Sequence, residues 1–338
     1  MNASDAELVS VRRALPRRAR MSNLAPLEFA LGAGVHAVVG TPADGTLAIA
    51  KLVGGFEPSA SGRVRVAGRD PGRDPLVRGR IGATLDVPSL PAARRVRDLL
   101  AEVDSLRGTR AAADALATFG LSHWADRKMV ALSSWELRAL DLLLAVTTVE
   151  PLALVLTEPG ADIAPIDRQV LRASLSRAAD AGACVIVVTA SMSDAIELAG
   201  TIHIFERGHI TRWVPVDETG ALVPGRGIEL RVEVDLPRLL VASLADEPGV
   251  VGIDWDEQRH RSVLSIRGAD LDRLALAIAR AAGAAGASVR SIAPLAPQLD
   301  EVRAAAAGLA LAAYHAAYGS YVAEGAERGA ARTGLGPA

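Results

Sequence analysis

The chain has 338 residues, half of them hydrophobic, which is enough to bury the cores of two domains. Its formal net charge of -2 gives no overall attraction to nucleic acid or to an anionic membrane, because such attraction needs clustered Lys and Arg. The single cysteine, Cys184, lies in an apolar run and is typical of a small buried residue rather than half of a disulfide. We therefore expect a globular protein with no nucleic-acid partner.

The first 20 residues contain arginines but no apolar stretch behind them, so they do not match a signal peptide. The most hydrophobic window, residues 140–156, is interrupted by Asp141, Glu150 and Pro151, whereas a spanning helix needs about 20 consecutive apolar residues. These patterns predict a cytoplasmic chain that does not itself cross a membrane.

Short apolar runs alternate with helix-like segments through the first two thirds of the chain. The runs at residues 35–39, 152–156, 184–188 and 202–205 are continuous, as expected for strands that are covered on both faces. Residues 96–140 are rich in helix formers and predict a helical subdomain. The order favours an α/β fold around a parallel sheet, and we place this domain at residues 1–219.

A Gly/Pro cluster at residues 220–227 predicts a linker. Behind it, apolar and charged residues alternate from Ile228 to Leu236, which indicates a strand with one wet face. The following elements complete a βαββαβ order, so residues 228–303 predict a small ferredoxin-like α+β domain. Residues 304–338 are Ala-rich and predict a helical tail, in which Tyr314, Tyr318 and Tyr321 share one helix face.

A Gly-x-x-x-x-Gly loop, residues 40–45, lies between the first apolar strand and the helix-like residues 48–53. This arrangement resembles the P-loop, in which backbone N–H groups and a helix N-terminus hold phosphates. The following segments, residues 51–58 and 61–68, resemble the opening of an ABC ATPase, where a Pro-x-Ser-Gly turn precedes a strand. The resemblance implies a P-loop NTPase fold of the ABC ATPase type.

The loop departs from the P-loop pattern at the residues that hold nucleotide. Thr46 stands where the phosphate-binding lysine is expected, and Leu47 stands where a hydroxyl binds Mg²⁺. The motif positions are Gly40, Asp44, Gly45, Thr46 and Leu47. Asp44 adds a negative charge. The lost lysine and the added carboxylate together cost up to about 6 kcal/mol at an effective dielectric of 20, or about four decades of affinity. We expect the loop to serve as a strand-to-helix turn.

The other ABC elements follow in the family's order, each altered. Asp86 stands at or near the Q-loop glutamine, and Ser133, Ser134 and Trp135 fall in the LSGGQ signature, where Trp135 replaces a glycine. For this segment two interpretations stay open: a retained phosphate contact, or a helix start capped by Ser133 or Ser134 with Trp135 packed on a neighbour.

The resemblance places Thr157 at the Mg²⁺-organising aspartate of the Walker B strand, Glu158 at the glutamate that polarises water, and Ala190 at the switch histidine. Residues 160–165 cover the D-loop without its aspartate before Pro165, and arginines at residues 17–20 occupy the A-loop region. Glu158 is therefore a vestigial catalytic residue.

The βαββαβ unit and residues 291–302 resemble the C-terminal domain of drug and ABC-2-type exporter ATPases, so the resemblance covers residues 8–303. It implies a noncatalytic subunit, a pseudo-ATPase, that acts as scaffold or regulator. Its partners would be an active ABC ATPase subunit, an integral membrane permease at the inner face of the cell membrane, or both.

Two alternatives stay open. Weak nucleotide binding or hydrolysis could survive in a heterodimeric exporter through Glu158 and Ser133, or the chain could be a free-standing interaction module that docks through its tyrosine face. The leading interpretation predicts no bound ATP, Mg²⁺ or other metal. The histidines lack metal-ligand spacing; they are His36, His123, His203, His209, His260 and His315.

Overall fold

The structure is a computed structural model that describes residues 7–17, 24–88, 90–160, 165–224, 226–245, 247–255 and 262–309. The tyrosine face at Tyr314, Tyr318 and Tyr321 lies outside these residues, as does most of the D-loop region. The chain forms two compact units that meet in sequence between Val216 and Asp217. None of the described helices is both long and apolar enough to cross a membrane.

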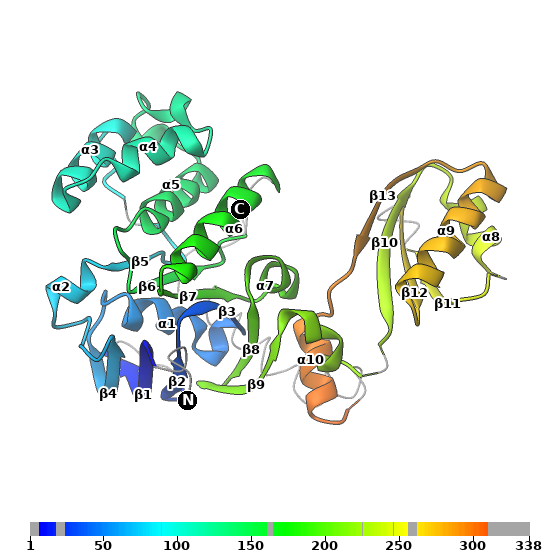
Figure 1. Ribbon diagram of the computed structural model, residues 1–338, viewed down its shortest axis with the longest axis horizontal. Coiled ribbons are helices and arrows are strands. Elements are labelled where there is room, and N and C mark those ends of the chain that lie inside the picture. Colours follow the sequence, from blue (N-terminus) through cyan, green and yellow to red (C-terminus); the bar gives the residue numbers. More distant parts are fainter. Residues whose placement is uncertain are drawn as a thin grey trace, which may run out of the picture. The chain divides into compact units, whose positions relative to one another are not determined.

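The first unit is built on a nine-stranded sheet with the order β4-β1-β2-β9-β8-β3-β7-β6-β5 (Figure 1). Its strands are β1 (Val9–Pro16), β2 (Leu27–Leu31), β3 (Gly34–Val39), β4 (Ser59–Val66), β5 (Ile81–Ala83), β6 (Ala153–Thr157), β7 (Cys184–Thr189), β8 (Thr201–Glu206) and β9 (His209–Pro215). Strands β5, β6, β7, β3 and β8 are parallel neighbours, whereas β1 pairs antiparallel with β2 and β4.

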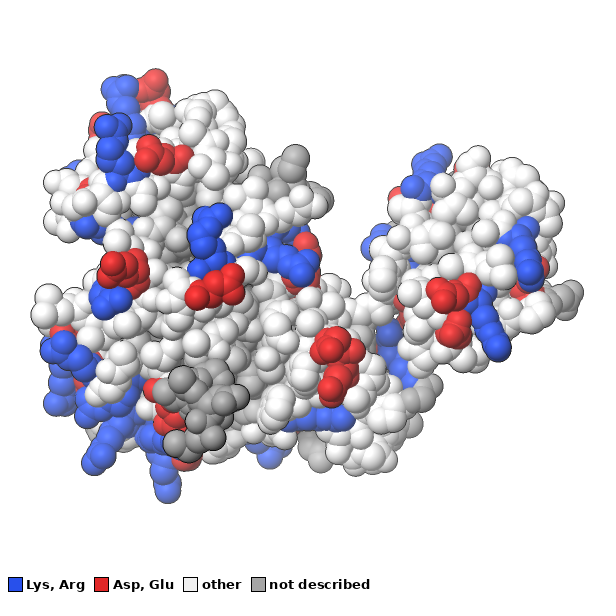
Figure 2. Space-filling view, in the orientation of Figure 1, with Lys and Arg blue, Asp and Glu red and all other residues white. Residues whose placement is uncertain are grey.

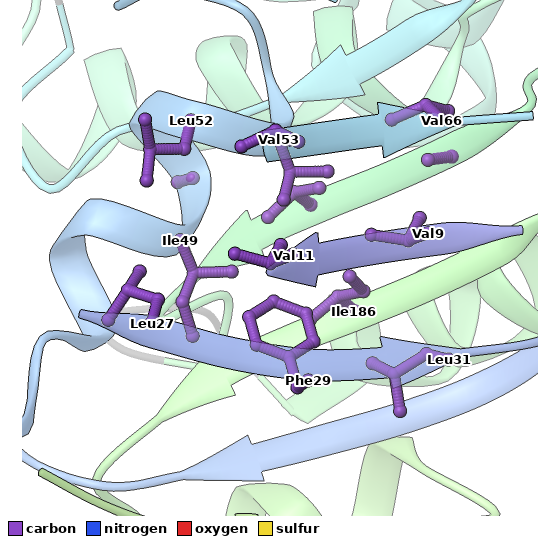
Figure 3. Packing of buried hydrophobic residues seen from close by; sticks show 14 of the residues in the cluster. Val9, Val11, Leu27, Phe29, Leu31, Ile49, Leu52, Val53, Val66 and Ile186 are labelled. Atoms are coloured by element: carbon purple, nitrogen blue, oxygen red, sulfur yellow. The ribbon is translucent and has the colours of Figure 1, made fainter. Parts of the chain in front are cut away.

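The helices of this unit lie on both faces of the parallel strands. They are α1 (Thr46–Val53), α2 (Pro75–Arg78), α3 (Val96–Arg107), α4 (Ala111–Thr118), α5 (Ser134–Val146), α6 (Pro165–Asp180) and α7 (Met192–Leu198). On one face Val155 and Ile186 pack with α1 and with β1, β2 and β4, and Figure 3 shows this core. On the other face Leu156 and Val187 pack with α5, α6 and α7. Because β6 and β7 are covered on both faces, all their residues are buried and nearly all are apolar.

The predicted helical subdomain forms from α3, α4 and α5 around its own apolar core. The buried carboxylate of Asp104 in α3 accepts hydrogen bonds from the Ala112 and Ala113 amides at 2.9 and 3.0 Å, which fixes the start of α4. Such an N-terminal cap contributes about 1 kcal/mol. The subdomain is thus held by local bonds and by packing.

The second unit has a four-stranded antiparallel sheet with the order β11-β12-β10-β13. Its elements are β10 (Ile228–Val234), α8 (Pro237–Leu244), β11 (Val250–Asp254), β12 (Val263–Gly268), α9 (Leu271–Ala285), β13 (Val289–Pro294) and α10 (Leu299–Ala306). Alternate residues of β10 and β12 are buried against α8 and α9. Arg226 bonds Glu229 at 2.6 Å and pairs with Glu301 at 3.2 Å, which joins α10 to the sheet.

The predicted fold class is confirmed: an α/β P-loop NTPase fold with a helical subdomain, followed by a ferredoxin-like unit. The four apolar runs are the strands β3, β6, β7 and β8, and the ferredoxin-like elements agree to within a few residues. The hairpin partners β1 and β2 and the strand β9 were not predicted. Residues 216–222, at the start of the predicted linker, form a 3-10 helix whose Leu222 is buried.

Two histidines meet inside the first unit. His36 of β3 and His203 of β8 lie with Nδ1 and Nε2 3.2 Å apart. Burial, with the neighbouring His36 adding to it, lowers the pKa of His203 from 6.5 to about 3, and burial also lowers the pKa of His36. The folded chain therefore holds the His203 imidazole neutral where the unfolded chain would protonate it.

This depressed pKa predicts a pH dependence of stability. The stabilisation is present above pH 6.5 and is lost as the pH falls toward 3, because only the unfolded chain takes up the proton. Between pH 7 and 5.5 the free energy of unfolding should fall by about 1.3 kcal/mol for this one group. In urea unfolding at both pH values, the natural sequence should lose about 1.3 kcal/mol more than His203→Gln does over this interval, whereas the exposed control His209→Asn should lose as much as the natural sequence. An unchanged difference in His203→Gln would contradict the assignment.

Candidate functional site

The phosphate-loop position begins directly after β3, where the chain makes a short 3-10 turn, Pro42–Asp44, before α1. Gly45 joins the two with a φ of 97°, and a Cβ there would lie 2.8 Å from the side chains of Leu24 and Leu27. Only glycine accommodates this backbone and this close approach. The glycine spacing is therefore explained by the turn itself, with or without a ligand.

The carboxylate of Asp44 folds back into the loop that precedes it. Its Oδ2 accepts hydrogen bonds from the Thr41 amide at 2.8 Å and the Thr41 hydroxyl at 2.6 Å, and its Oδ1 accepts from the Arg207 amide at 3.3 Å. The residue is only 6% exposed. The carboxylate is thus held inside the loop by donors of the chain itself, in the manner of a helix-capping residue.

The other polar groups of the loop also bond within the protein. The Gly40 amide donates to the Thr189 carbonyl at 3.0 Å, and the Gly45 amide donates to the Pro42 carbonyl at 3.1 Å. The Thr46 hydroxyl is buried and donates to the Thr41 carbonyl at 3.0 Å. Leu47 offers no oxygen to a metal. The groups named here have partners within the chain, which is compatible with the strand-to-helix interpretation.

Thr157, at the position of the Walker B aspartate, is buried at the end of β6. Its amide donates to the Thr84 hydroxyl at 2.9 Å, and its own hydroxyl donates to the Thr84 carbonyl at 3.2 Å. The two threonines therefore join the end of β6 to the segment after β5. A neutral hydroxyl that is used in this way is a poor substitute for a carboxylate ligand of Mg²⁺.

Glu158 follows with a φ of 44°, a backbone conformation that few non-glycine residues adopt. Its carboxylate accepts hydrogen bonds from the Thr189 hydroxyl at 2.7 Å and from the Ala190 amide at 2.8 Å. Its own amide donates to the Val188 carbonyl at 2.7 Å. Both carboxylate oxygens are therefore engaged with the segment that carries the switch position.

Arg138 of α5 joins three of these segments and was not predicted from the sequence. Its guanidinium donates to the carbonyls of Asp86 at 2.7 Å, Thr157 at 2.9 Å and Glu158 at 3.1 Å. The Asp86 side chain itself is exposed. One turn along α5, burial raises the pKa of Asp141 to about 6 although Arg138 opposes the shift. Two charged residues three positions apart on an apolar helix were the signal available in the sequence.

The signature-like segment lies at the start of α5. Ser133 is the N-cap: its hydroxyl and amide donate to the Glu136 carboxylate at 2.9 and 2.8 Å, and Glu136 is ion-paired with Arg127. Trp135 is 48% exposed and packs edge-on against the buried Trp124 with ring centroids 5.7 Å apart. Ser134 is exposed. The segment has the geometry of a capped helix start, with its serine bonded within its own turn.

The fold thus gathers the loop, the Walker B position and the switch position at the carboxyl edge of β3, β6 and β7, linked through Thr189. Asp86 joins them through Arg138, whereas the side-chain hydrogen bonds described for Ser133 stay within the helical subdomain. Within the described ranges, no three His, Cys, Asp or Glu side chains are grouped so as to hold a metal ion.

Comparisons with known proteins agree with this architecture, although no protein-family model matches the chain. The daunorubicin resistance ATP-binding protein DrrA2 of Streptomyces coeruleorubidus is 29% identical over 260 residues, which cover 73% of this chain and 80% of the relative. DrrA3 of the same organism is 28% identical over 205 residues, which cover 58% of this chain and 64% of the relative.

Solved structures give the same fold. The ATP-binding subunit of an ABC transporter superimposes with a TM-score of 0.56 at 17% identity, over 63% of this chain and 92% of that subunit. The ATP-binding cassette MJ1267 gives a TM-score of 0.51 at 19% identity, over 64% of this chain and 95% of the cassette. Sequence similarity and fold together identify this chain as a relative of the ATP-binding subunits of ABC transporters.

Proposed function

We propose that the chain is a noncatalytic ABC-transporter subunit, a scaffold or regulator that pairs with an active ATPase subunit, a membrane permease, or both. The observation that carries the proposal is the Asp44 carboxylate, which is bonded inside the loop where phosphate would bind. The drug-resistance names of its relatives favour an exporter. Such a subunit would work in the cytoplasm at the inner face of the cell membrane.

The charges around the loop support this proposal. A triphosphate carries several negative charges, and Asp44 would repel it while no lysine at position 46 attracts it. For a phosphate to enter the loop, the Asp44 carboxylate would have to move away, which would break its hydrogen bonds to Thr41. Phosphoryl transfer depends on positioned cations, and here the lysine, the metal-binding hydroxyl, the Walker B aspartate and the switch histidine are all replaced. Loss of several such groups at once removes useful turnover.

The site is also held together without nucleotide, as a scaffold requires. Glu158 bonds Thr189 and Ala190, and Arg138 holds the segments after β5 and β6 to α5. None of these connections passes through nucleotide or metal. Here side chains of the chain itself make them.

Isothermal titration of the purified chain with MgATP should therefore show no binding at micromolar concentrations. The double variant Asp44→Ala with Thr46→Lys removes the carboxylate, frees the Thr41 amide and adds the cation. This variant should raise the affinity for MgATP at least about 100-fold. The increase is smaller than the about four decades in affinity expected from the charges alone. Thr46→Lys alone should gain much less, because Asp44 remains.

Two results would contradict the proposal. Micromolar binding of MgATP by the natural sequence would favour the alternative of residual nucleotide binding in a heterodimer. ATP turnover at an ordinary rate that Glu158→Gln abolishes would assign Glu158 a catalytic role. Circular dichroism of every variant controls for misfolding.

The clamp formed by Arg138 gives a separate prediction. Arg138→Gln leaves carbonyls of Asp86, Thr157 and Glu158 without their donor, so the free energy of unfolding should fall by about 1–3 kcal/mol. Hydrogen–deuterium exchange should become faster at residues 84–88 and in α5, with or without ATP. Arg172→Gln, an exposed arginine on α6, is the matched control. Exchange that is unchanged in Arg138→Gln would mean that packing alone holds these segments.

A further inference from the structure

Arginines that are far apart in the sequence share one exposed face of the first unit. The antiparallel register places Arg12 of β1 opposite Arg63 of β4, and Ser10 opposite Arg65. The alternate residues of both strands, such as Val11 and Val64, are buried on the other side of the sheet. We call the outward set, with the arginines of the turn after β4, the arginine face: Arg12, Arg63, Arg65, Arg69 and Arg73. Figure 2 shows Lys and Arg side chains gathered over this corner, where Figure 1 places β1, β4 and α2.

The charge of this corner is opposite to that of the rest of the chain. Residues 7–17 and 57–78 contain eight arginines and four acidic residues, so they carry +4, whereas the whole chain carries -2 and the remainder therefore -6. Within the described contacts Arg63 and Arg65 make no hydrogen bond or ion pair. Arg12, Arg69 and Arg73 pair with nearby carboxylates, but these pairs are exposed and therefore weak.

The stability of the sheet does not account for this concentration of charge. Like charges directly opposite each other on neighbouring strands are destabilising, as Arg12 and Arg63 are. β4 is an edge strand, and a charge on an edge strand discourages unwanted strand pairing. One or two charged residues are enough to prevent strand pairing. Protection of the edge therefore does not explain why the arginines continue into the turn before α2.

An exposed apolar side chain lies beside the same face. A shallow depression there is lined by three arginines, two aspartates, a glycine and a proline: Arg65, Arg69, Arg73, Asp70, Asp74, Gly68 and Pro75. The next residue, Leu76 of α2, is 75% exposed. Basic residues around an exposed leucine are the combination that binds membrane interfaces, where the cations meet phosphates and the apolar group enters the headgroup region.

We propose that the arginine face, with Leu76, binds the surface of an anionic lipid bilayer. β1 and β4 contain no aromatic residue on which bases could stack, and a flat sheet face places no helix in a duplex groove. The rest of the chain, with its net negative charge, would be repelled by the same bilayer, so the chain would bind in one orientation. The inference rests on the proposed position at the membrane. Lipid binding by the purified chain would need neither nucleotide nor permease, so each of the two proposals can fail without the other.

The test is sedimentation of the full chain with vesicles of phosphatidylcholine, with and without about 30% phosphatidylglycerol. The chain should bind only the anionic vesicles, and binding should disappear at about 1 M salt, where charges are screened within about 3 Å. Arg63→Gln with Arg65→Gln should weaken partitioning about 25-fold, since one arginine near such a surface contributes about fivefold. Arg63→Lys with Arg65→Lys should keep it, and Leu76→Ser should weaken it severalfold.

The matched control is Arg231→Gln with Arg267→Gln, which removes two exposed strand arginines from the second unit. Both lie on a sheet face that also carries Glu229 and Glu233. This control should bind as the natural sequence does. Equal binding to neutral and anionic vesicles, or full binding by the Arg63/Arg65 glutamine variant, would overturn the proposal. A competing ligand could also overturn it. This would be a single-stranded oligonucleotide or an acidic peptide that displaces the chain from vesicles at a lower concentration than the lipid, and that the Arg63/Arg65 glutamine variant no longer binds.

Discussion

The hydrogen bonds of the Asp44 carboxylate fix the conformation of the loop on which the proposed function depends. A loop between a strand and a helix exposes several N–H groups, and an anion must satisfy them or the chain must do so itself. Here Asp44 bonds both polar groups of Thr41, so the chain itself satisfies part of the loop. Each further bond of the loop, from Gly40 to Thr189 and from Thr46 to Thr41, then has its partner inside the protein. The fold resembles that of ATP-binding subunits, and a carboxylate side chain is bonded inside this loop.

The same substitution of side chains for ligands recurs around the loop. Thr157 and Thr84 bond each other where a metal ligand is expected, and Glu158 bonds the switch segment. Arg138 supplies the cation that joins the edge of the sheet to the helical subdomain, although it lies on α5 rather than in the loop. These contacts stabilise one arrangement of the segments that nucleotide would otherwise organise.

The sequence predicts the fold better than it predicts the site. Strands β6 and β7 are covered on both faces, so their apolar runs are visible without the structure. The strand at residues 61–68 was expected from the family resemblance, but β1 was not, and the pairing of β1 with β4 spans about 50 residues, so the sequence did not indicate that their arginines share a face. The Thr41-x-x-Asp44 spacing is a capping pattern that was available in the sequence. The contacts of Arg138 were not, because they end on backbone carbonyls, which every residue has.

The bonds through Thr189 have a further consequence. Its carbonyl accepts from Gly40, and its hydroxyl reaches Glu158, so the ends of three strands are coupled by one residue. In the pairing proposed above, the partner binds nucleotide and this chain does not. A half that is fixed in this way would present an invariant docking surface throughout the cycle. The conformational change of such an assembly would then be asymmetric, because only the partner subunit would move.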